Sequence, residues 1–197
     1  LWEIVKNKDL GKVQIITMNF GSFKEYDMNN RFFNMNLAGG AMLDIGVYAL
    51  SIVRSFMDET PDEIVSQWKP SPTGSDEQAT ILLKNSLGQM ATVALSMHSK
   101  QPKRAMISCE KGYIEIMEYP RASKAILVDA ETGKQTELDC GDTANALYYE
   151  MTDMEQAVKN KICANKNGID KNSADKNDTN KNSESNEQNE QDEMHLA

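Results

Sequence analysis

The sequence of 197 residues lacks several features that mark whole classes of protein. It contains no uninterrupted run of 18 apolar residues, so we expect no membrane-spanning segment. It contains no Gly-x-Gly-x-x-Gly loop, which is the usual cradle for a dinucleotide pyrophosphate. Its first residues do not form a secretory signal peptide, because no charged segment precedes an apolar stretch there.

Cysteine is also scarce, with only Cys109, Cys140 and Cys163, and none of them belongs to a Cys-x-x-Cys pair. This excludes a disulfide framework and a cysteine-based zinc site. We therefore expect free thiols in a reducing cytoplasm and no metal centre. The formal net charge of −9 predicts an acidic surface that repels phosphate backbones, so nucleic acid is not an expected partner.

Hydrophobic residues make up 40% of the chain, and globular domains usually contain about 45–50%. The shortfall lies near the end of the chain, where Asn, Lys, Asp, Ser, Glu and Gln dominate residues 163–191. Such a segment buries too little apolar surface to offset its chain entropy, so we predict a disordered low-complexity insertion. Residues 192–197 regain apolar character and are predicted to begin a helix that is cut off.

Three segments have helical spacing of apolar residues, namely 1–8, 41–57 and 146–161. The central one is apolar around nearly its whole circumference, which predicts a mostly buried helix. Residues 21–36 have no clear period and predict a long loop. The four aromatic residues in that loop favour an ordered, functional segment over a disordered one.

β-Branched residues predict strands over 13–20 and 63–69. Further short strands flank three turn sequences, Asn85–Gly88, Glu110–Gly112 and Glu131–Lys134. Short strands joined by tight turns are typical of an antiparallel sheet.

Asp44 and Tyr48 carry the most suggestive chemistry, because residues four apart share one face of a helix. The carboxylate could bind a substrate hydroxyl, and the phenol could exchange a proton if a nearby cation lowers its pKa. Two structural alternatives stay open on spacing alone. Asp44 could cap the helix N-terminus, and Tyr48 could simply pack in the core.

Three further residues admit weaker predictions. Arg31 could reach a substrate or a cofactor phosphate, or could be an ordinary surface arginine. Trp68 lies on a predicted strand, which favours packing in the core. His98 follows a strand without any metal-like partner, so we expect an exposed side chain.

The segment Leu37–Leu50, LAGGAMLDIGVYAL, resembles the central helix of the glucose–fructose oxidoreductase, inositol dehydrogenase and rhizopine-catabolism (Gfo/Idh/MocA) family. In that family a Gly-Gly pair precedes Asp-x-Gly-x-Tyr or Asp-x-Gly-x-His, and residues 44–48 match the Tyr form. The approach through Arg31-Phe32-Phe33 is similar as well. The predicted order of elements agrees with the family over residues 1–162.

The resemblance implies an α+β fold with an open-faced, mostly antiparallel sheet and helices on one face. A Rossmann domain would lie beside it and is absent from this chain. Residues 1–10 would end that missing dinucleotide-binding domain, and residues 11–162 would form the substrate and oligomerisation domain. The open sheet face would pair with a second copy in a homodimer.

The resemblance also implies hydride transfer between NAD or NADP and a carbinol carbon of a sugar, polyol or diol. Tyr48 would be the general acid and base, and Asp44 would position the substrate hydroxyl. Arg31, Gly39 and Gly40 would contribute to substrate or cofactor binding. The sequence does not name the substrate or decide between NAD and NADP.

The family's Glu-Lys-Pro motif has no match in this chain, and neither does its phosphate loop. We therefore expect that the chain alone neither binds dinucleotide tightly nor turns over substrate. Two alternatives to an enzyme stay open, a non-catalytic ligand-sensing module and a dimerisation module of the same fold. The presence of both Asp44 and Tyr48 favours the enzyme.

Overall fold

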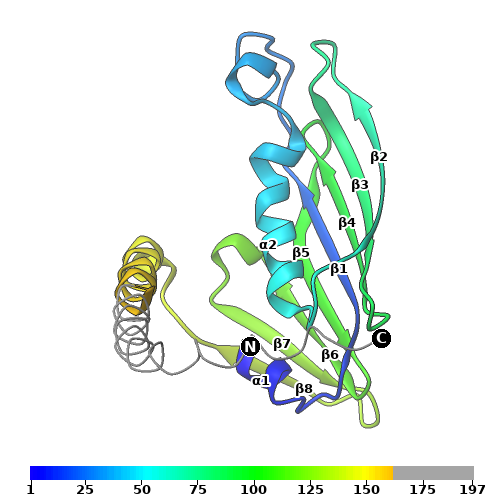
Figure 1. The fold of residues 1–197 in the computed structure, drawn as a ribbon, viewed down its shortest axis with the longest axis vertical. Coiled ribbons are helices and arrows are strands. Elements are labelled where there is room, and N and C mark those ends of the chain that lie inside the picture. Colours follow the sequence, from blue (N-terminus) through cyan, green and yellow to red (C-terminus); the bar gives the residue numbers. More distant parts are fainter. Residues whose placement is uncertain (162–197) are drawn as a thin grey trace, which may run out of the picture. The chain divides into compact units, whose positions relative to one another are not determined.

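The computed structural model describes residues 1–161. Contacts divide the chain into two compact units, residues 1–143 and a second unit that begins at Ala144 (Figure 1). The second unit contains the helix that the sequence predicts over residues 146–161. The predicted insertion at 163–191 and the predicted helix start at 192–197 lie outside the described residues.

The first unit is built on one eight-stranded sheet with the order β2-β3-β4-β1-β5-β6-β7-β8. All neighbouring pairs are antiparallel except β1 and β4, which run parallel. The expected mostly antiparallel sheet is therefore confirmed. The strands are β1 (Val13–Gly21), β2 (Glu63–Pro70), β3 (Asp76–Lys84), β4 (Met90–Ser96), β5 (Gln101–Cys109), β6 (Gly112–Met117), β7 (Lys124–Asp129) and β8 (Gln135–Asp139).

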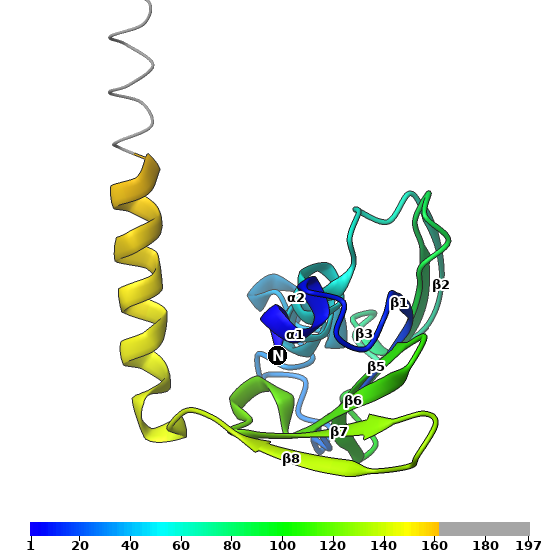
Figure 2. The ribbon, with the colours of Figure 1, turned by 90° about the horizontal axis from the view of Figure 1, so that it is seen from below.

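The three predicted hairpins are also confirmed, since β3 pairs with β4, β5 with β6 and β7 with β8. Helical segments connect and cover the strands. They are α1 (Trp2–Lys6), η1 (Met35–Leu37), η2 (Met42–Gly46), α2 (Val47–Phe56), η3 (Tyr119–Arg121) and η4 (Thr143–Asn145). Figure 2 shows α1 and α2 on the concave side of the curved sheet, and within residues 1–143 no helix covers the convex side.

The core lies between α2 and the concave face of the sheet. Ala49 and Val53 of α2 are buried, as are Ile16 and Met18 of β1, the strand that α2 contacts. Apolar side chains on alternate residues of a strand point to one face, which is why each central strand contributes every second residue to this core. The site discussed below lies where the helical segment enters this core.

The prediction that the central helix is mostly buried is wrong for one of its sides. Leu43, Val47 and Tyr48 are each at least half exposed. The first turn, η2, is π-helical, and the sheet supplies apolar surface only to the opposite side. By length and composition the stretch Met35–Phe56 could cross a membrane, and its one-sided packing against β1 accounts for the apolar residues on the buried side.

The prediction that Trp68 packs in the core is also wrong, because its side chain is 59% exposed. β2 is the edge strand of the sheet, and every one of its positions is exposed. Strand propensity does not distinguish an edge strand from a central one, and only the strand order decides burial here.

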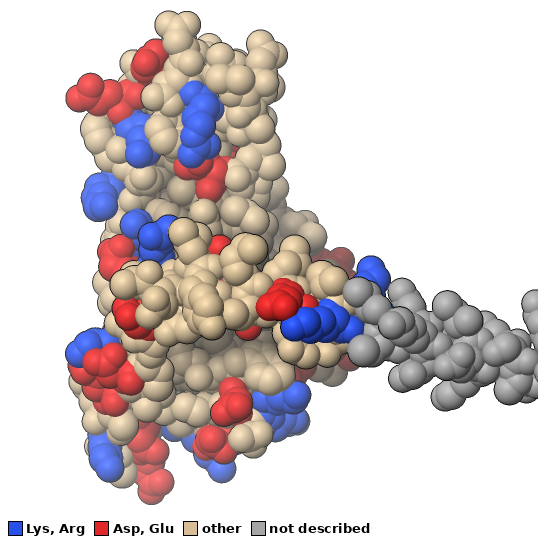
Figure 3. Space-filling view, turned by 90° about the vertical axis from the view of Figure 1, so that its left-hand side faces the viewer, with Lys and Arg blue, Asp and Glu red and all other residues tan. Residues whose placement is uncertain are grey.

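Charged side chains of both signs are interspersed on the face of residues 1–161 shown in Figure 3. Surface ion pairs within residues 1–161 include Lys84 with Glu63 at 2.7 Å and Lys124 with Glu137 at 2.8 Å. Exposed pairs of this kind contribute little stability, typically about 0–1 kcal/mol each. The face in Figure 3 shows no broad patch of one sign.

Candidate functional site

The Gly39-Gly40 pair shapes the entry into η2. Gly40 has φ of +126°, a left-handed conformation that a side chain rarely adopts. A Cβ at this position would collide with the carboxylate of Asp76 on β3. That carboxylate accepts a hydrogen bond of 2.6 Å from the backbone N–H of Met42. A distant side chain therefore caps the first turn of η2, and the glycine makes room for it.

Gly39 allows the preceding loop to fold back on itself. A Cβ there would lie 2.8 Å from the backbone nitrogen of Asn34, and the Gly39 N–H donates to the Asn34 carbonyl at 2.9 Å. The two glycines therefore have local structural roles. Their predicted part in substrate or cofactor binding stays a prediction.

The folded loop brings Arg31 against Asp44. Arg31 Nη2 lies 2.6 Å from Asp44 Oδ1, and the carboxylate side chain is only 14% exposed. The Arg31 guanidinium also lies over the ring of Phe32, at 4.5 Å from its centroid. Within residues 1–161 the Asp76 carboxylate accepts the capping hydrogen bond from Met42, and so Asp76 fills the role that was one alternative for Asp44. Two of the predicted site residues are thus a bonded pair.

Tyr48 stands at the start of α2 with its ring half exposed. The ring packs against Phe20 at the end of β1, with centroids 6.3 Å apart. The Tyr48 hydroxyl makes no hydrogen bond within residues 1–161, and no direct contact joins it to the Asp44 carboxylate there. The phenol therefore packs by its ring and presents a hydroxyl that is available to a ligand.

A separate cavity of about 420 Å³ lies between η2 and the edge strands, and neither Asp44 nor Tyr48 lines it. Its lining is mainly apolar. It lacks a free titratable group, because Asp76 is bonded to Met42. The predicted proton-transfer residues Asp44 and Tyr48 therefore lie outside this cavity. Its lining residues are Met35, Ala38, Gly39, Met42, Leu43, Ser66, Gln67, Trp68, Gly74, Ser75, Asp76 and Ala79.

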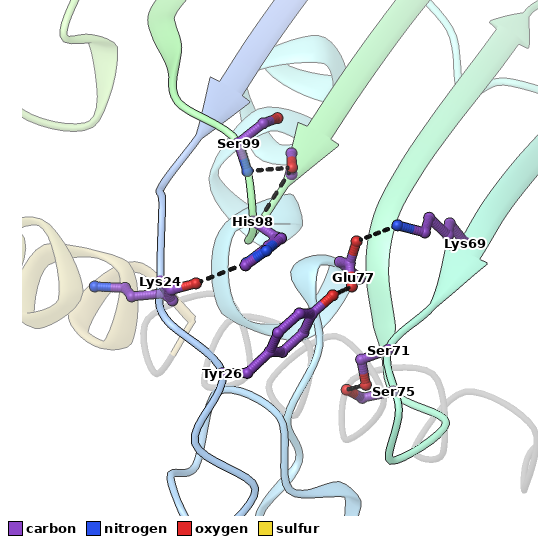
Figure 4. Close-up of polar contacts among 9 residues, drawn as sticks. Lys24, Tyr26, Lys69, Ser71, Ser75, Glu77, His98 and Ser99 are labelled. Carbon is purple, nitrogen blue, oxygen red and sulfur yellow. Dashed lines mark hydrogen bonds and ion pairs between the residues drawn. The ribbon is translucent and has the colours of Figure 1, made fainter.

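A buried carboxylate that the sequence analysis did not single out anchors the loop before η2. Glu77 of β3 is 1% exposed and accepts hydrogen bonds from the Tyr26 hydroxyl and from Lys69 Nζ, the latter at 2.8 Å (Figure 4). Burial raises the pKa of the Glu77 carboxyl, but the hydrogen bonds from Lys69 and Tyr26 outweigh it, and the net pKa lies below its ordinary value. The hydrogen bond to Glu77 raises the pKa of the Tyr26 hydroxyl.

His98 belongs to the same cluster, and the prediction that it is exposed is wrong. Its ring stacks on Tyr26 with centroids 4.1 Å apart, and its Nδ1 donates to the Lys24 carbonyl at 2.9 Å (Figure 4). The loop aromatics were the signal that this segment is ordered. The period-two pattern of β3 would have found Glu77, since it alternates with the core residues Ala79 and Ile81.

Comparison with known proteins shows which family the chain resembles. The family model described as the GFO/IDH/MocA C-terminal domain matches residues 1–115. A trans-1,2-dihydrobenzene-1,2-diol dehydrogenase of Xenopus laevis is 28% identical over 147 residues, which cover 74% of this chain and 43% of the relative. One of the same name from Danio rerio is 26% identical over 164 residues, covering 79% of this chain and 48% of the relative.

Solved structures share the fold. KijD10, a 3-ketoreductase from Actinomadura kijaniata in complex with NADP and TDP-benzene, has a TM-score of 0.63 at 17% identity, covering 72% of this chain and 45% of that one. An aldose-aldose oxidoreductase from Caulobacter crescentus has a TM-score of 0.61 at 22% identity, covering 72% and 43%. The chain thus spans less than half the length of these relatives.

Proposed function

Because this chain belongs to the GFO/IDH/MocA family of oxidoreductases, whose C-terminal domain matches residues 1–115, we propose that it forms the substrate side of an NAD(P)-dependent dehydrogenase. The reaction moves a hydride to or from a carbinol carbon of a sugar, polyol or diol. The observation that carries the proposal is the half-exposed Tyr48 phenol, whose hydroxyl makes no hydrogen bond within residues 1–161, four residues after the Asp44 carboxylate that Arg31 holds.

Tyr48 is the proton carrier in this proposal. When a carbinol is oxidised, its hydroxyl proton must leave as the hydride leaves carbon, and a phenol at hydrogen-bond distance of the oxygen receives it. The reverse reaction returns the proton. The half-exposed position of Tyr48 leaves room for a substrate oxygen beside its hydroxyl.

Asp44 positions a substrate hydroxyl. An ionised carboxylate has about four lone-pair sites, and the contact with Arg31 Nη2 leaves acceptor capacity on both oxygens. Arg31 also compensates the charge of this largely buried carboxylate, which limits the cost of its desolvation. The pair therefore offers a fixed acceptor four residues before the proposed acid and base in the helical segment.

The nicotinamide cofactor supplies or accepts the hydride when it is bound. Within residues 1–161, Tyr48 and Asp44 fit the proton transfer that accompanies hydride transfer. The same residues 1–161 do not fit dinucleotide binding. These residues have no glycine-rich phosphate loop, and Arg31 is committed to Asp44. We assign cofactor binding to a part of the protein outside them, and we infer that the chain alone is inactive.

Replacing Tyr48 with Phe tests the proposal in the protein expressed from its full reading frame. General acid and base catalysis contributes about 10²–10⁴-fold, so kcat should fall by about that factor while ligand affinity changes little. Tyr113→Phe, on β6, is the matched control and should keep full activity. Unchanged turnover in Tyr48→Phe would show that another residue carries the proton, and a wild type that binds ligand without turnover would favour the non-catalytic sensing module.

The same proposal includes a homodimer formed through the open sheet face. Leu82, Met90 and Met117 alternate with core residues on their strands and are each more than 40% exposed. The edge strand β2 adds Val65, which is exposed and pairs with Leu82. Exposed apolar area of this kind is typical of an interface. A monomeric mass by light scattering of the full protein would contradict it.

A further inference from the structure

Lys103 and Glu118 meet beside the ring on which Tyr48 packs. Lys103 Nζ lies 5.4 Å from the centroid of Phe20, and the ring of Tyr48 packs against the same Phe20. Lys103 Nζ is also 3.3 Å from Glu118 Oε2. Lys103 of β5 therefore shares the Phe20 ring with the proposed proton carrier, and Glu118, from the turn after β6, joins it through Lys103.

The contact with Phe20 places Lys103 on the side of the sheet that carries α2, because Phe20 is buried in the core on that side. Alternation alone does not fix this side, since the register of β5 against β1 shifts between Arg104 and Gln101. The Lys103 side chain is only 32% exposed, although lysine side chains are usually exposed. This cation accordingly belongs to the substrate side and not to the open face.

The backbone of Glu118 supports a role for its side chain. Glu118 has φ of +54° and ψ of +37°, in the left-handed region. This conformation costs a residue with a side chain roughly 1–2 kcal/mol, and glycine adopts it freely. Non-glycine residues in such conformations cluster at functional sites. Here the turn carries a carboxylate back to Lys103.

We propose that Lys103 and Glu118 form a charge-balanced pair that binds substrate hydroxyls and sets specificity for neutral vicinal diols, including those of sugars, over anionic sugars. This inference rests on the proposed function of Tyr48. An ammonium donates to one hydroxyl oxygen, and a carboxylate accepts from the neighbouring hydroxyl, so adjacent hydroxyls satisfy both groups.

The charge balance of the whole site supports the choice of a neutral ligand. Arg31 compensates Asp44, and Lys103 compensates Glu118, so neither pair leaves a free cation for a carboxylate or phosphate. An anionic substrate would find no uncompensated cation in either pair. A charge left without a partner in a site is a common source of specificity.

The test compares D-glucose, trans-cyclohexane-1,2-diol and D-glucuronate as substrates of the protein expressed from its full reading frame. Wild type should prefer the neutral compounds. Glu118→Gln leaves Lys103 uncompensated, so the ratio of kcat/KM for glucuronate to that for glucose should rise by about tenfold, mainly through KM. Lys103→Met should raise KM for both neutral compounds by about the same factor.

Glu118→Gly separates a binding role from a structural one. Glycine relieves the left-handed backbone, so the melting temperature should rise while the preference shifts as in Glu118→Gln. Glu137→Gln, which breaks the exposed Lys124–Glu137 pair, is the matched control and should leave the preference unchanged.

An unchanged glucuronate-to-glucose ratio in both Glu118 variants would overturn the proposal, as would a wild type that prefers glucuronate or turns over neither neutral compound. Tyr48→Phe distinguishes a failure of the Lys103–Glu118 proposal from a failure of the proposed role of Tyr48. If that variant stays active while the Glu118 variants shift the preference, the specificity pair stands and the proton carrier must be another residue.

Discussion

Arg31 Nη2 lies 2.6 Å from Asp44 Oδ1 and joins the loop before η2 to its first turn. The two ends of the pair are unequal, because the Arg31 side chain is mostly exposed and the Asp44 side chain is mostly buried. Such a pair contributes little to stability at its exposed end. It matters more for the orientation and charge of the carboxylate that it holds.

Replacing Arg31 with Met should therefore lower activity more than stability. We expect kcat/KM to fall by about tenfold or more, because Asp44 loses its orienting partner. The free energy of unfolding should change by about 1 kcal/mol at most. Steady-state kinetics and urea denaturation measure the two quantities. Arg104→Met, which breaks the Arg104–Glu115 pair of 2.5 Å on the sheet, is the control and should leave kcat/KM unchanged.

Glu77 should make stability depend on acid pH. Its folded-state pKa lies below the ordinary value of 4.5, so its contribution is present above pH 4.5 and is lost as the pH falls through the folded-state pKa. Glu77→Gln should lower stability at pH 7 by about 1–3 kcal/mol, because Lys69 and Tyr26 lose a charged acceptor. Melting temperatures between pH 7 and pH 3 measure this. Equal acid dependence in both proteins would contradict the assignment.

Removal of the Tyr119 hydroxyl should not lower the stability of the protein. The Tyr119 side chain is buried, burial raises the pKa of its hydroxyl, and that hydroxyl has no hydrogen-bond partner in the described part of the chain. A buried polar group without a partner opposes folding. Tyr119→Phe should thus be neutral or stabilise by up to about 1 kcal/mol in urea denaturation. A clear loss of stability would mean that the hydroxyl has a partner.

Gly40→Ala should destabilise the protein more than an alanine at another left-handed glycine. The Cβ would collide with Asp76 and displace the cap of η2, so we expect a cost of about 2 kcal/mol or more. Gly88→Ala is the matched control, because Gly88 has φ of +78° and nothing within 4 Å of its Cβ position. That variant should cost only the backbone strain, about 1 kcal/mol. Thermal denaturation of both variants checks the difference, and equal costs would show that the contact with Asp76 is unimportant.

Much of the fold was predictable because turn chemistry and strand periodicity are local. The sequences around Asn85–Gly88 and Glu110–Gly112 identified two hairpins that the structure confirms. The parallel pairing of β1 with β4 was not predictable in this way. In the chain, 68 residues lie between Gly21 and Met90, and they include a helix and two other strands. The edge position of Trp68 depends on that same strand order.

The candidate site also contains residues that the sequence revealed and contacts that only the structure revealed. The spacing of Asp44 and Tyr48, the Gly39-Gly40 pair and Arg31 were visible along the chain. Their partners were not, because Asp76 reaches the Gly40–Met42 turn from β3 and Phe20 reaches Tyr48 from β1.

The sequence alone determined the hairpins, the central helical segment and the family motif, because each depends on residues within one or two turns or strands of each other. The tertiary structure decided that Asp76 caps η2 and that Arg31 pairs with Asp44. It also decided that Lys103 packs on Phe20, the ring that Tyr48 contacts. Those choices depend on contacts between segments far apart in the chain, and only the packing of the sheet against α2 selects among the charged residues available.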